Sequence, residues 1–522
     1  MTDNSKSFPS RRDFIKFVVA GSIASGCPID KALLAAPPSG AAPTANVEGE
    51  HFTICHEVRD GHDFVAPYAT RKVDILIIGG GMAGLSAAYF LRGKDWLLLE
   101  KEAHFGGNAY QEEFAGQPYS TGAAYDFRGS PSDHLAKEIG LHLLPIDMPD
   151  PTIDNGVYTP DTWRSGLSQL PYSKQTVASF QKFADDILKL DPRKNILELD
   201  SKPFTEITKN YAPEVTKWWD AYGLSNWGAV TEDTTAFIGV VDAQYLIKGE
   251  DSTRVILPGG LGCISHKLVE VMTPKYGERM LAGATVVSVV PDAKEVRVTY
   301  IQEDRLTTVA AKLVIMCAPK FIASRLVTHL PDEQKLAMQR MRYAPVPMIN
   351  MIFDKRFYDK GYDNWCPGNA FTDFIVADWT IRNQSGYHPK YEILTFYSTL
   401  REAQRYQLLQ EADCKAFAAK VLTDFQQLLP EFHIDPIEIH LYRRGHAMMM
   451  AVPNQYTKNR VIASHPMDRI FFANSDSGGP ESLTMEAVRI SQAATEWANL
   501  TLAGNSTAAA ATAQKALTAV TF

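Results

Sequence analysis

The chain has 522 residues, which is too long for one compact core, so two or more domains are expected. Hydrophobic residues make up 45% of it and charged residues 21%, which excludes an intrinsically disordered chain and an integral membrane protein. The formal net charge of −8 excludes a basic nucleic-acid-binding surface and mildly favours a cationic substrate.

The N-terminus carries an export pattern. Residues 10–16 read SRRDFIK, which resembles the twin-arginine consensus, and the apolar stretch at 17–24 is too short to cross a bilayer. We therefore predict a signal peptide at residues 1–36, periplasmic localisation and no transmembrane segment. Acylation of Cys27 is an alternative. Because twin-arginine substrates are exported already folded, this pattern also favours a cofactor bound before export.

Residues 37–70 are predicted to be a linker and an N-terminal extension, since their first part is rich in proline and small residues. His51, Cys55, His56 and His62 fall close together in this extension. A metal or haem contact is conceivable there. The spacing matches no standard zinc pattern, and the chain has no CxxC, so we predict no metal site.

A strand, turn and helix follow at the start of the folded part. Residues 73–78 form a β-branched run, Gly79 to Gly84 read GGGMAG, and residues 96–99 form the next buried strand. Gly79 permits the tight turn, Gly81 allows backbone to approach a diphosphate together with the amides of Met82 and Ala83, and Gly84 allows close helix packing. Glu100 ends the second strand, where its carboxylate would bind ribose hydroxyls, with Lys101 beside it. The pattern predicts dinucleotide binding.

Several later motifs resemble the flavin-containing amine oxidase family. They are Gly106-Gly107-Asn108, Pro258 to Gly262, Val286 in its strand, Ala318-Pro319 and Arg469 to Ala473, which occur in the family's order over residues 73–498. The resemblance implies FAD as the cofactor and an α/β fold in which a Rossmann-like FAD-binding domain is interleaved with an α+β substrate domain. It assigns 71–127, 253–318 and 464–502 to the FAD domain and 128–252 and 319–463 to the substrate domain.

The resemblance also implies individual contacts to FAD. The backbone of Val286 would hold the adenine, and Gly106, Gly107 and Asn108 would pass close to the cofactor. Asp476 would replace the family's usual glutamate at the ribityl chain. A helix beginning near Thr484 and Met485 would direct its amides at the flavin's pyrimidine edge. Residues 503–522 are predicted to be a flexible tail.

The branch of the family is indicated by two segments. Arg444 to Ala447 and Ala473 to Gly479 resemble the branch that contains bacterial spermidine dehydrogenase. The strand at residues 347–351 lacks the lysine that many oxidases of the family carry near the flavin N5. We therefore expect a dehydrogenase that passes electrons to a cytochrome or a quinone, with oxygen as the alternative acceptor, and FAD held without a covalent bond.

The substrate pocket is predicted to be aromatic, because aromatic rings bind a cation and lower its pKa towards the neutral, reactive amine. The candidate rings are Trp218, Trp219, Tyr222, Trp227, Trp365, Trp379 and Tyr456, most of which also suit a hydrophobic core. His446, Trp227 and Tyr456 are the catalytic candidates. Haem is possible for His446 and the methionines at 448–450, but no motif supports it.

Two other functions remain open from the sequence. The same cofactor motifs occur in protoporphyrinogen oxidase and carotenoid desaturases, which act on large apolar substrates. A third possibility is a non-catalytic flavin-fold protein that serves as a partner in assembly or electron transfer.

Overall fold

The computed structural model describes residues 43–147 and 149–518. The predicted signal peptide therefore lies outside the described residues, as do Cys27 and the first part of the predicted linker.

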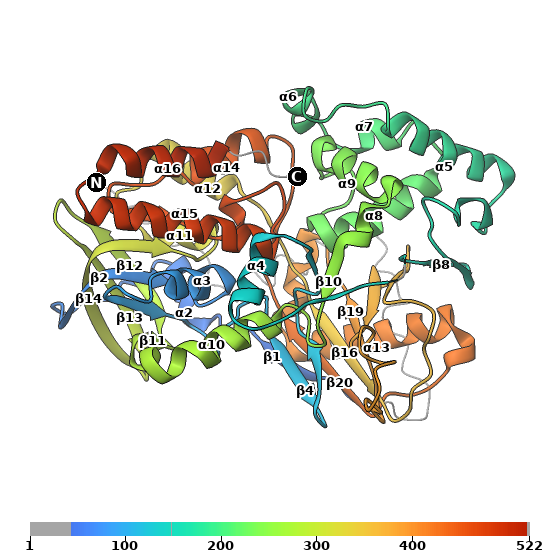
Figure 1. Cartoon of the computed structure of the whole chain (residues 1–522), viewed down its shortest axis with the longest axis horizontal. Helices are drawn as coiled ribbons and strands as arrows, with labels where there is room; N and C mark the ends of the chain where they lie inside the picture. Colours follow the sequence, from blue (N-terminus) through green and yellow to red (C-terminus); the bar gives the residue numbers. More distant parts are fainter. Residues whose placement is uncertain (1–42, 148, 519–522) are drawn as a thin grey trace, which may run out of the picture. The chain divides into compact units, whose positions relative to one another are not determined.

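A seven-stranded sheet is built from three distant segments of the chain (Figure 1). Its parallel strands are β2 (Arg71–Ile78), β3 (Trp96–Leu99), β11 (Met280–Leu281), β14 (Arg305–Met316) and β22 (Ile470–Phe472). The strands β12 (Thr285–Pro291) and β13 (Val296–Gln302) extend it as an antiparallel meander. This mixed, mainly parallel sheet confirms the predicted α/β class.

The strand β14 differs from its prediction. The sequence indicates two strands, at 306–309 and 313–317, whereas the structure has one strand from Arg305 to Met316. Its first half pairs with β13 and its second half with β2, because the intervening Ala310, Ala311 and Lys312 provide no turn. One strand thus joins the meander to the parallel part of the sheet.

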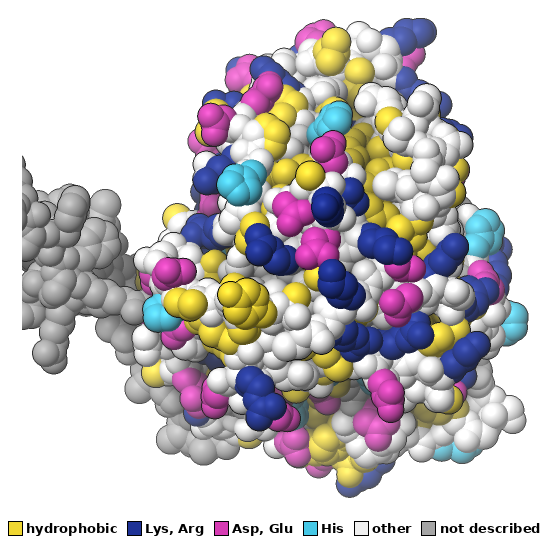
Figure 2. Space-filling model, turned by 90° about the vertical axis from the view of Figure 1, so that its left-hand side faces the viewer, with side chains coloured by type: hydrophobic (Ala, Val, Ile, Leu, Met, Phe, Trp, Pro, Cys, Tyr) yellow, Lys and Arg dark blue, Asp and Glu magenta, His cyan; other side chains and the backbone are white. Residues whose placement is uncertain are grey.

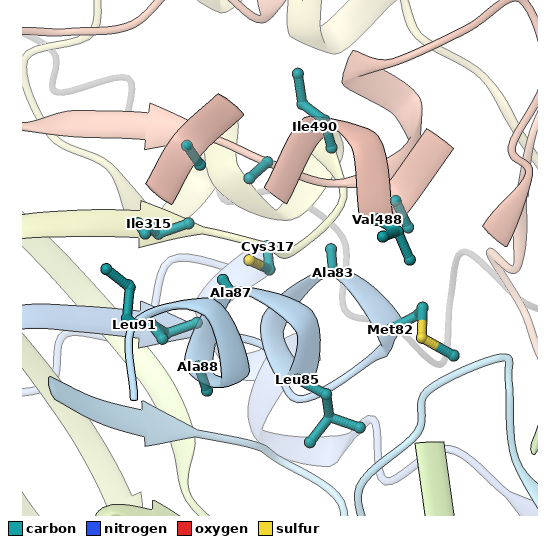
Figure 3. Packing of buried hydrophobic residues seen from close by; sticks show 14 of the residues in the cluster. Met82, Ala83, Leu85, Ala87, Ala88, Leu91, Ile315, Cys317, Val488 and Ile490 are labelled. Atoms are coloured by element: carbon teal, nitrogen blue, oxygen red, sulfur yellow. The ribbon is translucent and has the colours of Figure 1, made fainter. Parts of the chain in front are cut away.

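The two faces of this sheet are covered by different helices. Ile75 and Ile77 of β2 contact one cluster, with helices α3 (Met82–Phe90), α10 (Gly262–Tyr276) and α15 (Thr484–Leu502). Leu76 and Ile78 alternate to the other face, which helices α11 (Lys320–Leu326), α12 (Asp332–Arg340) and α14 (Arg460–Ala463) cover. Figure 3 shows α3 turned towards Ile315, Cys317 and Val488.

The second large sheet has eight strands in the order β1-β20-β16-β19-β18-β17-β8-β9. Their bounds are β1 (Asn46–Gly49), β20 (Glu438–Arg443), β16 (Met348–Phe353), β19 (Glu392–Tyr397), β18 (Asp373–Val376), β17 (Asp363–Trp365), β8 (Thr152–Asp154) and β9 (Val157–Thr159). Helix α13 (Glu411–Leu428) packs against β20 and β1. The N-terminal extension thus contributes the edge strand β1, which pairs in parallel with β20.

Three helices lie beside this sheet (Figure 1). Their side chains contribute to an aromatic core. The helices are α5 (Lys174–Ile187), α8 (Pro213–Trp227) and α9 (Ala236–Lys248). The sequence indicates helix near 174–190, 264–272, 332–341, 401–429 and 483–499, and the structure has helix in each range. The sequence analysis missed α8 and α9. The apolar residues of α9 cover most of its surface and leave no clear amphipathic period, whereas the buried Val215, Trp218, Trp219 and Tyr222 of α8 follow helical spacing.

The predicted flexible tail is wrong for the residues that are described. Helix α16 (Ser506–Thr518) packs along α15, and Ala509, Ala513 and Leu517 are buried. The side chain of Arg460 also donates to the carbonyl of Leu517 at 2.9 Å. Small alanine side chains allow this close packing, although they give a weak hydrophobic signal in the sequence.

The other elements are short. They are α2 (Thr53–Arg59), β4 (Gln111–Phe114), β5 (Gln117–Ser120), β6 (Asp126–Phe127), α4 (Pro131–Glu138), β7 (Leu144–Pro145), η2 (Leu167–Gln169), α6 (Ile196–Asp200), α7 (Thr205–Thr208), η3 (Glu250–Thr253), β10 (Arg254–Ile256), η4 (Gly277–Arg279), β15 (Tyr343–Ala344), η5 (Glu402–Leu408), η6 (Pro430–Phe432), β21 (Met448–Met449), η7 (Gln455–Asn459) and η8 (Ser475–Ser477). In the described part of the chain, no helix combines the length and apolar character needed to span a bilayer. On the face shown in Figure 2, Lys and Arg side chains are intermixed with Asp and Glu side chains.

Candidate active site

The glycine turn between β2 and α3 has the backbone that its sequence predicts. Gly79 has φ +100°, a conformation that side-chain-bearing residues rarely adopt. A Cβ on Gly84 would lie 1.8 Å from the carbonyl oxygen of Gly79, so only glycine allows the helix to start this close to the strand. Within the described residues no side chain caps α3, so the amides at Met82 and Ala83 are available to an anion.

Glu100 lies directly beside this turn. Its carboxylate accepts from the Gly80 amide at 2.6 Å and from the Glu102 amide at 2.8 Å, and the residue is only 7% exposed. Burial raises the pKa of Glu100, while these two amides and the Lys101 ammonium lower it. The Lys101 ammonium itself is bonded to Glu102. Glu100 therefore lies where a ribose next to the diphosphate turn would be bound.

A second glycine turn packs against the first. The Gly106 amide donates to the Gly80 carbonyl at 2.9 Å, and a Cβ on Gly107 would lie 3.0 Å from the Gly81 Cα. Gly107 also has φ +58°. Asn108 donates its side-chain amide to the Ala447 carbonyl at 2.7 Å. The two glycine turns therefore pack closely together at the N-terminus of α3, where no side chain separates their backbones.

The residues just before Val286 connect its strand to the Glu100 region. The amides of Gly283 and Ala284 donate to the carbonyls of Glu102 and Glu100 at 2.8 and 2.7 Å. The register of β12 against β13 shifts directly after Val286, whose side chain is buried. The strand therefore begins beside Glu100, as adenine recognition by the backbone of Val286 would require.

Asp476 is the centre of a buried polar network that the sequence analysis missed. Asp476 and Lys320 form an ion pair in which both side chains are 0% exposed. The second carboxylate oxygen accepts from the Tyr343 hydroxyl at 2.6 Å and from the Lys320 amide at 3.0 Å. Lys320 also bonds the Ser477 hydroxyl at 2.5 Å. The predicted contact of Asp476 with the ribityl chain stays a prediction.

The N-terminus of α15 is open in the predicted way. No side chain caps it within the described residues, and Thr484 and Met485 are its first two residues. Glu486 in the same turn is buried and bonded by Arg489 at 2.7 Å. Arg460 fixes the preceding loop, because its guanidinium donates to the carbonyls of Ser477 and Gly478 at 2.9 and 2.6 Å.

A pair of carboxyl groups lies between the helical aromatic core and the loop before α15. Asp242 of α9 and Glu481 of that loop share a hydrogen bond, and Asp242 also accepts from the Trp227 indole at 2.7 Å. Burial raises the pKa of Asp242 to about 6. Burial and the neighbouring Asp242 raise the pKa of Glu481 well above its usual range. The two carboxyl groups therefore hold a proton more readily than exposed carboxyl groups do.

The predicted aromatic rings separate into two groups. Trp218, Trp219, Tyr222, Trp227, Trp365 and Tyr456 pack together in one core, whereas Trp379 is partly buried in another cluster, below the Arg382 guanidinium at 4.9 Å. Trp227 is 0% and Tyr456 3% exposed, so the structure gives both rings a packing role. Their catalytic role stays a prediction, and Trp227 is linked to the carboxyl pair by its bond to Asp242.

His446 lies outside this core. Its ring stacks on Phe321 at 4.5 Å. Burial, with Arg405 and other nearby cationic groups, lowers the pKa of His446 to about 3, so the ring is neutral at physiological pH. A catalytic role for His446 stays a prediction.

The residues of the His51, Cys55, His56 and His62 cluster have separate surroundings. His51 bonds Glu102 at 2.5 Å, His56 lies against the Phe52 ring, and His62 lies against Phe64. Across residues 43–147 and 149–518, no group of three or more His, Cys, Asp or Glu side chains is arranged to hold a metal ion. The five cysteines in these ranges are unpaired.

The residues present fit FAD. The side-chain-free turns at Gly79 to Gly84 and Gly106-Gly107, the open amides of α3 and the carboxylate of Glu100 suit a diphosphate and its ribose. The open N-terminus of α15 suits the electron-rich end of a flavin.

Comparisons with known proteins agree with this geometry. The family model described as flavin containing amine oxidoreductase matches residues 82–519. A protein named probable flavin-containing monoamine oxidase A from Dictyostelium discoideum is 24% identical over 339 residues, which cover 58% of this chain and 71% of that protein. An L-amino-acid oxidase from Pseudechis australis is 24% identical over 446 residues, covering 76% and 81%. The structure of wild-type putrescine oxidase bound to putrescine superposes with a TM-score of 0.63 and 18% identity, covering 81% of this chain and 98% of that one.

Proposed function

The chain belongs to the family of flavin-containing amine oxidoreductases and uses FAD, and we propose that its substrate is an amine that carries a second ammonium group. The observation that supports this substrate class is the Asp242–Glu481 pair, because buried Asp242 and half-buried Glu481 of the loop before α15 can together neutralise an ammonium group. Bound FAD supplies the acceptor for the hydride that leaves the α-carbon of the neutral amine.

The protein's own groups then act mainly by binding. Asp242 and Glu481 would bind the distal ammonium group of the substrate. The reacting amine would then lie on the other side of the aromatic cluster that contains Tyr222. Tyr222 also hydrogen-bonds Asp242. A poorly hydrated, aromatic surrounding favours the neutral form of the reacting amine. A large apolar substrate would leave the two carboxyl groups without a cationic partner, which argues against a desaturase-like function.

The test is anaerobic reduction of the flavin, followed as bleaching of its visible absorption. We expect putrescine or spermidine to reduce the wild-type flavin at far lower concentration than butylamine. Asp242→Asn should raise the concentration needed for the diamine about tenfold or more and leave butylamine unchanged. Equal efficiency of diamine and monoamine would contradict the proposed substrate class. Failure of all amines to reduce the flavin would favour a non-catalytic partner protein.

We also propose that the electrons leave to a cytochrome or quinone rather than to oxygen. The support is the strand β16, which is fully buried and contains no lysine, with Asn350 as its polar residue. Stopped-flow reoxidation tests this proposal. The reduced enzyme should react with a soluble quinone at least tenfold faster than with dissolved oxygen, and the reverse order would contradict it.

Periplasmic localisation by the twin-arginine pathway is proposed from residues 10–16, which lie outside the described residues. Replacing Arg11 and Arg12 by lysine should retain the flavoprotein in the cytoplasm. Unchanged periplasmic activity of that variant would contradict this localisation.

A further inference from the structure

Arg444 belongs to the substrate segment but reaches into the cofactor-binding half. It follows β20, and its Nε donates to the Thr121 carbonyl at 3.2 Å while Nη2 donates to the Thr121 hydroxyl at 3.0 Å. Its Nη1 donates to the Gly107 carbonyl at 3.1 Å and to the Asn108 side-chain oxygen at 3.2 Å. The guanidinium therefore joins three chain segments at the second glycine turn.

All four acceptors of this guanidinium are neutral. Among the described residues no carboxylate lies within ion-pair distance of Arg444. Glu102 is instead bonded to Lys101 and His51, and Glu50 accepts from the Gly445 amide at 3.2 Å. Arg444 is half-buried, and the carboxylates of Glu50 and Glu102 act on it only from beyond ion-pair distance, so a closer anion would stabilise the guanidinium further.

The position of Arg444 indicates which anion that is. Gly107, whose carbonyl Arg444 binds, packs directly on Gly81, the N-cap residue of α3. The amide dipoles of α3 and the guanidinium charge thus converge on the same turn. Four of the five N–H groups of the guanidinium are used by protein acceptors, so one remains for a ligand.

We propose that Arg444 is a further cofactor-binding residue, which neutralises the diphosphate of FAD. The sequence assigns the diphosphate only to backbone amides, which carry partial charges, whereas Arg444 contributes a full positive charge. This inference depends on FAD as the cofactor and is independent of the amine that is oxidised.

The experiment titrates the flavin-free full-length protein with FAD and with riboflavin, which lacks phosphate, and follows quenching of flavin fluorescence. Arg444→Gln should weaken FAD binding roughly 10- to 100-fold and change riboflavin binding less than twofold. Arg444→Lys keeps the positive charge but lacks the planar guanidinium, so its affinity for FAD should lie between those of the wild type and Arg444→Gln. The matched control is Arg443→Gln, because that guanidinium lies over the Phe52 ring at 5.6 Å, and it should bind FAD like the wild type.

A purely structural role for Arg444 would give a different result. If the side chain only fastens Thr121 to Gly107, Arg444→Gln will weaken FAD and riboflavin equally, and the proposal is overturned. A second measurement uses the wild-type chain, so it does not depend on folding of a variant. Phenylglyoxal labelling of Arg444, mapped by mass spectrometry, should be blocked by inorganic pyrophosphate. Equal labelling with and without pyrophosphate would also overturn the proposal.

Discussion

Replacing Lys320 by methionine tests the buried network around Asp476. Methionine keeps the apolar volume of the lysine stem but removes the ammonium group, so the Asp476 carboxylate loses its ion partner while the Tyr343 hydroxyl and the Lys320 amide remain. Both members of the pair are 0% exposed, so the remaining carboxylate is shielded from bulk water. Removing one partner of a buried pair costs about 3–5 kcal/mol.

This free energy converts to a shift in the unfolding midpoint. For the unit at Pro43–Phe522, of roughly 480 residues, the entropy of unfolding is about 1 kcal/mol/K, so the expected decrease is about 3–5 °C. Thermal unfolding followed by circular dichroism measures it, and flavin content per chain is recorded on the same samples. The matched control is Lys209→Met, which removes an exposed pair with Glu206 and should leave the midpoint unchanged.

The double variant Lys320→Met with Asp476→Leu distinguishes two causes of destabilisation. One is loss of the attraction between the two side chains, and the other is a buried carboxylate left without an ion partner. Because the double variant removes both charges, it should be more stable than Lys320→Met alone. The reasoning would be refuted if Lys320→Met lowered the midpoint no more than the control, or if the two substitutions destabilised additively.

Three other changes have expected outcomes. Gly84→Ala places a methyl group against the first glycine of the turn, so it should cost about 1–3 kcal/mol and lower the flavin content, measured as the ratio of flavin to protein absorption; full flavin loading would contradict the close packing. The apparent affinity for a diamine should rise as pH increases through about 6, since Asp242 is protonated below that value and charged above it, and the step should be absent in Asp242→Asn when KM is measured from pH 5 to 8. Ending the chain at residue 505 removes α16 and one carbonyl partner of Arg460, and should destabilise the protein by about 2–3 kcal/mol in urea unfolding; an unchanged midpoint would show that α16 contributes no stability.

The parts predictable from sequence are those whose signals are local. The turn from Gly79 to Gly84 and the carboxylate at Glu100 lie within about one βαβ unit, so their spacing alone specifies their relative positions. The polar partners Lys320 and Asp476 are buried only because two distant strands, β14 and β22, end side by side. No local pattern indicates that pairing.

Arg444 and the Asp242–Glu481 pair were missed for the same reason. Each joins groups that are far apart in the chain, Arg444 with Gly107 and Asp242 with Glu481. Helix α16 was missed for a different reason. Its buried Ala509, Ala513 and Leu517 follow helical spacing, but alanine buries little area and gives a weak signal.

The pairing of β1 with β20 affects the order in which this protein can be completed. Asn46 to Gly49 find their partners at residues 440–443, so the first described strand must wait until the ribosome has made most of the polypeptide. Until then, His51 cannot be held by this strand against Glu102 beside the nucleotide turn. Because β22 and α15 follow β20 in the chain, the N-terminal strand and the C-terminal part of the seven-stranded sheet are both completed only near the end of synthesis.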